Sequence, residues 1–167
     1  MFERGIYKLW YIDNRPSPNL LKMRTSTFPR GPWSEPEICK VEGVPEDREL
    51  WHLDVVKVKD GYDALFVLIN KGKRLRKAEL YFGTSEDGVN WKLLSVPILI
   101  PSERDWDNWL IYRSTAILLE EKEVGGVISR RYAVWYSACS KGKEWHTGYT
   151  EFSVCINDGK IILCNAS

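Results

Sequence analysis

Three residues at the head of one apolar run have side chains that could bind or transform a ligand: Trp51, His52 and Asp54. Residues 53–58, which include Asp54, are typical of a buried strand. Side chains alternate along a strand, so His52 and Asp54 share one face, and a nearby carboxylate favours the protonated imidazole. Trp51 could stack on a sugar ring or another flat apolar face. The alternative is structural: Asp54 accepts backbone N–H bonds from a neighbouring loop, with His52 beside it.

A second cluster of such residues lies in the segment "ERDWDNWLIYRST", residues 103–115. Trp106 could supply a stacking surface, and Asp107, Tyr112 and Arg113 could line the same site as the first cluster. A guanidinium such as that of Arg113 orients a carboxylate or a sugar hydroxyl well. The alternative for this segment is an ion pair that joins two sheets above a packed tryptophan. We therefore expect Asp54 as a catalytic carboxylate and the other residues of both clusters as ligand-binding groups.

The elements that must position these residues are strands. No segment sustains the i, i+3, i+4, i+7 apolar spacing of a helix, whereas short alternating or β-branched runs recur between turn signals. The tripeptides at 59–61, 86–88 and 157–159 each end in Asp-Gly, which is typical of tight turns because glycine tolerates a positive φ. The chain is predicted to be all-β.

Internal repeats refine this prediction. Three predicted strands begin with a tyrosine, at Tyr7, Tyr62 and Tyr132, and each is followed by a strand that ends in small polar residues. A repeat of about 55–70 residues with four antiparallel strands is typical of a β-propeller blade. We expect one domain, 1–167, with three blade-like units at about 5–45, 50–101 and 110–167, the first lacking its first strand. A β-sandwich with coincidentally similar strands is the alternative.

Three blades are too few for a closed ring, which ordinarily needs about four to eight. An open stack would leave an apolar face exposed at each end. The sequence therefore predicts further blades from a longer chain, or self-association, for instance two copies that close a six-bladed ring through a twofold axis.

The segments "LWHLDVVKVKDGYDALF" (50–66), "TSEDGVNW" (84–91) and "YRSTAILL…YAVWYSA…HTGYTE" (112–151) resemble the five-bladed propeller glycosidases, the superfamily of glycoside hydrolase families 43, 32 and 68. The resemblance covers roughly residues 5–155. It implies that the first strand of each blade faces a central channel and carries site residues at its beginning. It also implies a Ser-x-Asp-Gly-x-x-Trp hairpin between third and fourth strands.

The resemblance further implies three carboxylates in the channel, because one must protonate the leaving oxygen while another attacks or activates water. Asp54 is the residue that matches such a position. The expected function is a carbohydrate-directed protein that binds or hydrolyses a glycosidic bond at the channel mouth. The alternatives are a non-catalytic structural or interaction module, for example of a viral particle or a larger assembly, and a lectin-like sugar binder.

Composition excludes some other classes. Twenty-four Lys and Arg against 23 Asp and Glu give a net charge of +1, which argues against nucleic-acid or membrane-surface partners. The four cysteines have neither Cys-x-x-Cys spacing nor a histidine cluster, so we expect no metal site and no cofactor. Without a recognisable secretion signal or transmembrane run, we expect a cytoplasmic location, with a virion as the alternative, and reduced, mostly buried cysteines.

Overall fold

The computed structural model describes residues 1–72, 77–103 and 105–164. All its regular elements are strands, arranged in three sheets. Sheet A contains β1 (Phe2–Glu3), β2 (Ile6–Asp13), β3 (Leu20–Ser26) and β4 (Glu37–Ile38). Sheet B contains β6 (Arg48–Val58), β7 (Gly61–Asn70), β8 (Glu79–Ser85) and β9 (Asn90–Leu93), with β5 (Lys40–Glu42) added parallel to β9. Sheet C contains β10 (Leu110–Val124), β11 (Val127–Cys139), β12 (Trp145–Asn157) and β13 (Lys160–Cys164).

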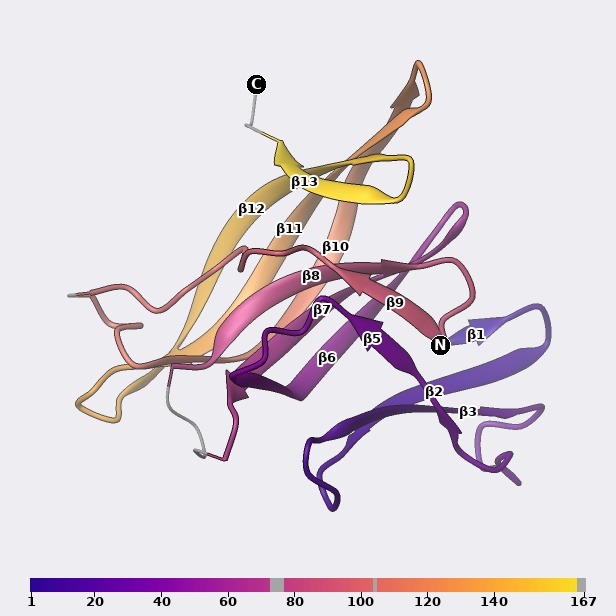
Figure 1. Cartoon of the computed structure of the whole chain (residues 1–167), viewed down its shortest axis with the longest axis horizontal. Coiled ribbons are helices and arrows are strands. Elements are labelled where there is room, and N and C mark those ends of the chain that lie inside the picture. Colours follow the sequence, from indigo (N-terminus) through magenta and orange to yellow (C-terminus); the bar gives the residue numbers. More distant parts are fainter. Residues whose placement is uncertain (73–76, 104, 165–167) are drawn as a thin grey trace.

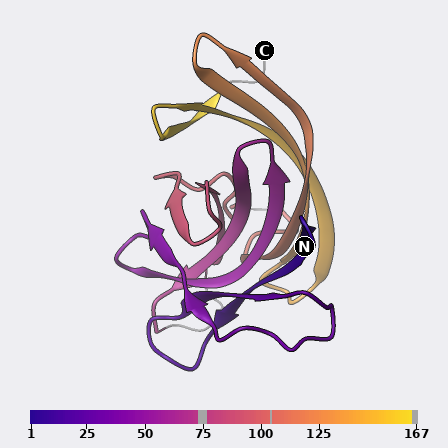
Figure 2. The ribbon, with the colours of Figure 1, turned by 90° about the vertical axis from the view of Figure 1, so that its right-hand side faces the viewer.

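Sheet B lies between sheets A and C, and sheet C is long and strongly curved (Figures 1 and 2). Apart from β5, each sheet is an antiparallel meander of four consecutive strands, which is the architecture of a propeller blade. The predicted all-β, partial-propeller fold is therefore confirmed, in preference to the β-sandwich. The first unit was expected to lack its first strand, and β1, only two residues long, occupies that place.

The central strand of the middle sheet supplies two cores at once. Residues 61–69 of β7 are all buried, and their side chains alternate between the two faces of sheet B. Leu65 and Val67 enter the cluster shared with sheet C, whereas Ala64 and Phe66 enter the cluster shared with sheet A. This explains why the run "ALFVLI" is apolar at every position rather than at alternate ones.

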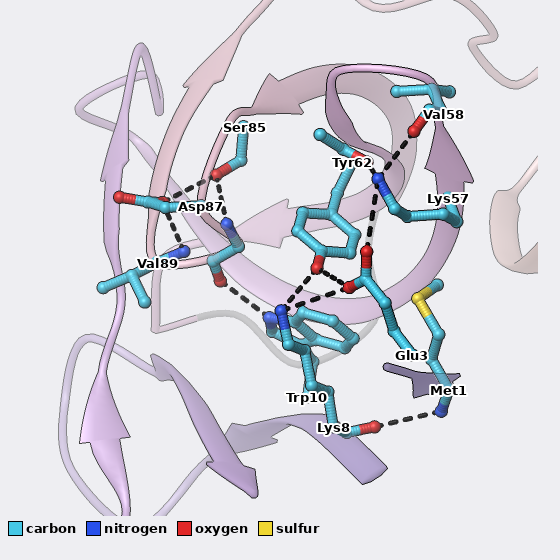
Figure 3. A network of polar contacts seen from close by, with 12 residues as sticks. Met1, Glu3, Lys8, Trp10, Lys57, Val58, Tyr62, Ser85, Asp87 and Val89 are labelled. Carbon is cyan, nitrogen blue, oxygen red and sulfur yellow. Dashed lines mark hydrogen bonds and ion pairs between the residues drawn. The ribbon is translucent and has the colours of Figure 1, made fainter. Parts of the chain in front are cut away.

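A polar joint connects sheets A and B at the end of β6 (Figure 3). Lys8 donates a hydrogen bond to the Tyr62 hydroxyl, which donates to the Glu3 carboxylate. Lys57 approaches the same carboxylate at 3.6 Å. The hydrogen bond from Tyr62 lowers the pKa of Glu3; burial opposes this effect, and the two lysines add to it.

A second joint, buried, connects sheets B and C. Arg130 on β11 contacts both carboxylate oxygens of Asp63 on β7 at 3.1 Å, and its Nε donates to Glu121 at 2.6 Å. The hydroxyl of Tyr132 also donates to Asp63. Burial raises the pKa of Asp63 and is opposed by the adjacent guanidinium.

The cysteine prediction needs a correction. Cys155 on β12 and Cys164 on β13 form a disulfide across the last hairpin, with their Cα atoms 5.8 Å apart, whereas Cys39 and Cys139 are free and buried. The expectation that all four are reduced is therefore wrong. The partners are nine residues apart and become neighbours only because β12 and β13 pair. In the described ranges no helix is long and apolar enough to cross a membrane.

Candidate functional site

A cleft of about 510 Å³ opens where one strand from each sheet comes together. It lies at the end of β2 and at the beginnings of β6 and β10, so sheet A contributes its second strand, whereas the strands β6 and β10 are the first of their meanders. The residues that line the cleft are Tyr11, Ile12, Asn14, Trp51, His52, Leu53, Val67, Arg113 and Ser114.

A β-bulge in β6 sets the direction of two of these side chains. Leu50 pairs with Leu68 and His52 pairs with Val67, so Trp51 is the extra residue. Leu50 and Leu53 both pack in the core shared with sheet A. Trp51 and His52 therefore project from the opposite side of the strand, with ring centroids 5.5 Å apart.

An equivalent bulge occurs at the start of β10. Ile111 pairs with Ala138 and Arg113 pairs with Ser137, so Tyr112 is the extra residue there. Tyr112 and Arg113 thus occupy in sheet C the places of Trp51 and His52 in sheet B. Bulges of this kind are common beside functional sites, because they re-aim side chains at the end of a strand.

His52 is held by aromatic rings rather than by a carboxylate. Tyr112 meets its ring edge-on at a centroid distance of 4.8 Å, and His52 Nε2 is buried with no hydrogen-bond partner among the described residues. Burial, with a smaller effect from the positive charge of Arg113, lowers the pKa of His52 to about 4. The expectation of a protonated His52 is therefore wrong, and the imidazole is neutral at pH 7.

Asp54 connects two sheets. Its Oδ2 accepts hydrogen bonds from the Thr115 hydroxyl and from the Ala116 backbone N–H, both at 3.0 Å. Both donors belong to β10, so the carboxylate joins β6 to the equivalent strand of sheet C. This is close to the structural alternative considered for Asp54, except that the donors lie on a strand instead of a loop.

Trp106 and Asp107 lie outside the cleft. Trp106 stacks on Tyr136 at a centroid distance of 5.7 Å, with His146 at its edge. Asp107 is buried, and its Oδ2 accepts a hydrogen bond of 3.3 Å from the Tyr136 hydroxyl. Its Oδ1 is buried without a partner in the part of the chain that is described. The two predicted clusters therefore meet through His52, Tyr112 and Arg113, whereas Trp106 and Asp107 pack against sheet C.

The sequence predictions missed the contribution of sheet A to the cleft. Tyr11 and Asn14 lie at the end of the first aromatic strand, and Ser114 follows Arg113 on β10. The repeat gave no signal for Tyr11, because aligning Tyr7 with Tyr62 makes it the counterpart of Phe66, which is buried in the core shared with sheet A. That alignment did not reveal that sheet A would contribute its second strand to the cleft.

None of the nine residues that line the cleft carries a carboxylate. Within residues 1–72, 77–103 and 105–164, no group of three or more His, Cys, Asp or Glu side chains is placed to hold a metal ion. What the cleft offers is aromatic surface from Trp51 and Tyr11, together with polar groups from His52, Asn14 and Arg113.

No family model matches this sequence, and no match was found among curated proteins. Among solved structures, a protein described as "Glycoside hydrolase" is similar to the chain with a TM-score of 0.49 and 15% sequence identity. The similarity covers 87% of this chain and 40% of that protein, so the chain spans less than half the length of that neighbour.

Proposed function

We propose that this protein binds a carbohydrate in the cleft between β2, β6 and β10. The observation that carries the proposal is the convergence, from three separate sheets, of aromatic rings and hydrogen-bonding side chains on one cavity of about 510 Å³. A sugar ring presents an apolar C–H face and a rim of hydroxyl groups. An indole can cover the apolar face, whereas guanidinium, amide and imidazole groups can form hydrogen bonds with the hydroxyl groups.

The neutral state of His52 supports a ligand rich in hydroxyl groups. A neutral imidazole offers one donor and one acceptor, which matches a hydroxyl group.

The proposal is for binding, without hydrolysis by the residues described. Glycoside hydrolysis canonically needs two carboxyl groups on either side of the scissile bond. The cleft-lining residues include none, and Asp54 is engaged by Thr115 and Ala116. The sequence resemblance to propeller glycosidases agrees with the class of ligand, and the side chains at the cleft favour the lectin-like form of that prediction.

Calorimetric titration with a panel of neutral pentose and hexose oligosaccharides tests this proposal. We expect saturable binding that Arg113→Ala and Trp51→Ala each weaken about tenfold or more, which corresponds to about 1.4 kcal/mol. Arg113 is exposed, so its removal tests the cleft without disturbing the core. Trp33→Ala is the matched control, because Trp33 lies in the loop before β4 and does not line the cleft.

Two results would overturn the proposal. One is the absence of binding to every member of the panel by a folded protein. The other is binding that is as strong in Arg113→Ala and Trp51→Ala as in the unmodified chain.

A further inference from the structure

The outer face of sheet C, which points away from sheet B, carries a cluster of exposed apolar side chains. Trp135 on β11 pairs with Tyr149 on β12, and their ring centroids are 5.2 Å apart. Ile117, on the neighbouring β10, lies two residues from the partner of Trp135. The exposed fractions are 39% for Trp135, 53% for Tyr149 and 55% for Ile117. Contiguous apolar surface of this kind marks an interaction site.

The internal repeat identifies what these positions do in the other two sheets. When Tyr7, Tyr62 and Tyr132 are aligned, the strand registers give three equivalent cross-strand pairs. These pairs are Trp10–Met23 in sheet A, Leu65–Phe82 in sheet B and Trp135–Tyr149 in sheet C. The pair of sheet A packs against sheet B, and the pair of sheet B packs against sheet C.

The first strands repeat the pattern. The bulges make His52 on β6 equivalent to Arg113 on β10. Val56 and Ile117 each lie four residues further along their strands, so they are equivalent as well. Val56 packs in the core between sheets B and C, whereas Ile117 is exposed. The outer face of sheet C therefore has apolar residues at the positions that, in sheets A and B, pack against the following blade.

A counterpart for such a face is the outer face of sheet A. Trp10 and Ile12 pack toward sheet B, so the alternate residues Tyr7 and Leu9 point away from it. Leu9 is 44% exposed and pairs with Arg24 on β3. This face thus combines apolar and basic side chains.

We propose that the outer face of sheet C docks onto the outer face of sheet A in a second copy of this chain. Arg24 has no ion-pair partner among the described residues, and Glu151, two residues from Tyr149, lies on the face that Arg24 would meet, where it is 40% exposed and pairs with Arg131. Two copies joined in this way at both faces form a closed ring of six blades, which is within the usual range of about four to eight. A twofold axis closes the ring and leaves no outer blade face exposed.

Light scattering on the 167-residue chain after size-exclusion chromatography tests the proposal. We expect a mass of twice 19.4 kDa. Ile117→Glu should convert the dimer to a monomer. Ile100→Glu is the matched control, because Ile100 is also 55% exposed but lies in the loop after β9, away from both outer faces.

Leu9→Glu distinguishes the proposed contact from a contact between two copies of sheet C. In the proposed ring it also produces a monomer, and mixing it with Ile117→Glu restores dimers because one interface in the mixed pair is intact. A monomeric wild-type chain would overturn the proposal and favour a partner other than a second copy. A dimer that survives either Ile117→Glu or Leu9→Glu would overturn it as well.

Discussion

His52 lies where two effects disfavour its proton. Aromatic rings exclude water from the imidazole, and Arg113 adds a like charge nearby, so the pKa falls from about 6.5 to about 4. The neutral ring keeps one nitrogen as an acceptor, which a charged ring would lose. The residue is therefore suited to hold a hydroxyl group across the physiological pH range.

The pH dependence of His52 can be measured directly. We expect its ring resonances, assigned by their loss in His52→Gln, to titrate near pH 4 in the folded protein. Because the folded pKa lies below the unfolded value, the unfolded state binds more protons between about pH 4 and 6.5. The free energy of unfolding should therefore fall as the pH drops through this window, and His52→Gln should flatten that slope. A midpoint above pH 6 would contradict the buried, neutral assignment.

Asp54 is expected to affect stability through its bonds to β10. In Asp54→Ala, the N–H of Ala116 and the hydroxyl of Thr115 lose their acceptor, so we expect a loss of about 1–3 kcal/mol in urea unfolding. Asp54→Asn keeps an acceptor oxygen and should lose less. Thr115→Ala is the control, because it removes one hydrogen-bond donor together with that donor's need for an acceptor. Equal stability of Asp54→Ala and the wild type would contradict the role assigned to this carboxylate.

At the residue scale, the sequence could predict which groups lie near the cleft but not how each is used. Trp51, His52 and Arg113 all line it, as their places at strand beginnings suggest. The bulge at Trp51 has no local sequence signature, and it determines that Trp51 and His52 share a side. The partners of Asp54 lie 61 and 62 residues away, so its role could not be inferred from its neighbours.

At the scale of the elements, the turn between β8 and β9 fixes the contact between sheets A and B. Asp87 accepts hydrogen bonds from the N–H groups of Val89 and Asn90 at 2.7 and 2.8 Å. Burial opposes the charge of Asp87, but these hydrogen bonds dominate and lower its pKa to about 2. The carbonyl of Gly88 then accepts the indole N–H of Trp10 from sheet A at 2.7 Å (Figure 3).

Gly88→Ala should destabilise the protein by more than the backbone strain of an alanine at positive φ. Gly88 has φ +83°, and an added Cβ would lie 2.8 Å from Cζ2 of Trp10. The matched control is Gly126→Ala, because Gly126 has φ +81° and open space around it. The control should lose roughly 1–2 kcal/mol from backbone strain. Gly88→Ala should lose about 1–3 kcal/mol more, since Trp10 must move. Equal losses in thermal or urea unfolding would contradict the close approach of Trp10.

The strands and turns were predictable because each has a local cause. Asp158 and Gly159, for example, both have positive φ in the two-residue turn between β12 and β13, as the Asn-Asp-Gly signal indicates. Elements that depend on distant partners were not predictable. Strand β5 exists because three residues reach β9 in parallel, and β1 because two residues fold back on β2.

At the scale of the whole molecule, the buried ion pair of Arg130 and Asp63 helps to join sheets B and C. Removing one partner of such a pair leaves a buried charge without compensation, which costs about 3–5 kcal/mol. We therefore expect Arg130→Ala to lose on this order in urea unfolding. Lys40→Ala is the control: Lys40 on β5 pairs with Glu42 at the surface, outside the proposed interface, where such a pair contributes about 0–1 kcal/mol. Similar losses of unfolding free energy in the two variants would contradict the stabilising role assigned to the Arg130–Asp63 pair.

Whether three sheets together form a binding site is tested most directly by following tryptophan indole N–H resonances during titration with oligosaccharides. The chain has eight tryptophans, and Trp91 is an internal reference because its indole donates to the carbonyl of Gly88 away from the cleft. We predict that the Trp51 resonance shifts saturably with a ligand from the panel while that of Trp91 stays in place. A Trp51 resonance that does not move at saturating ligand would contradict the cleft as the carbohydrate site.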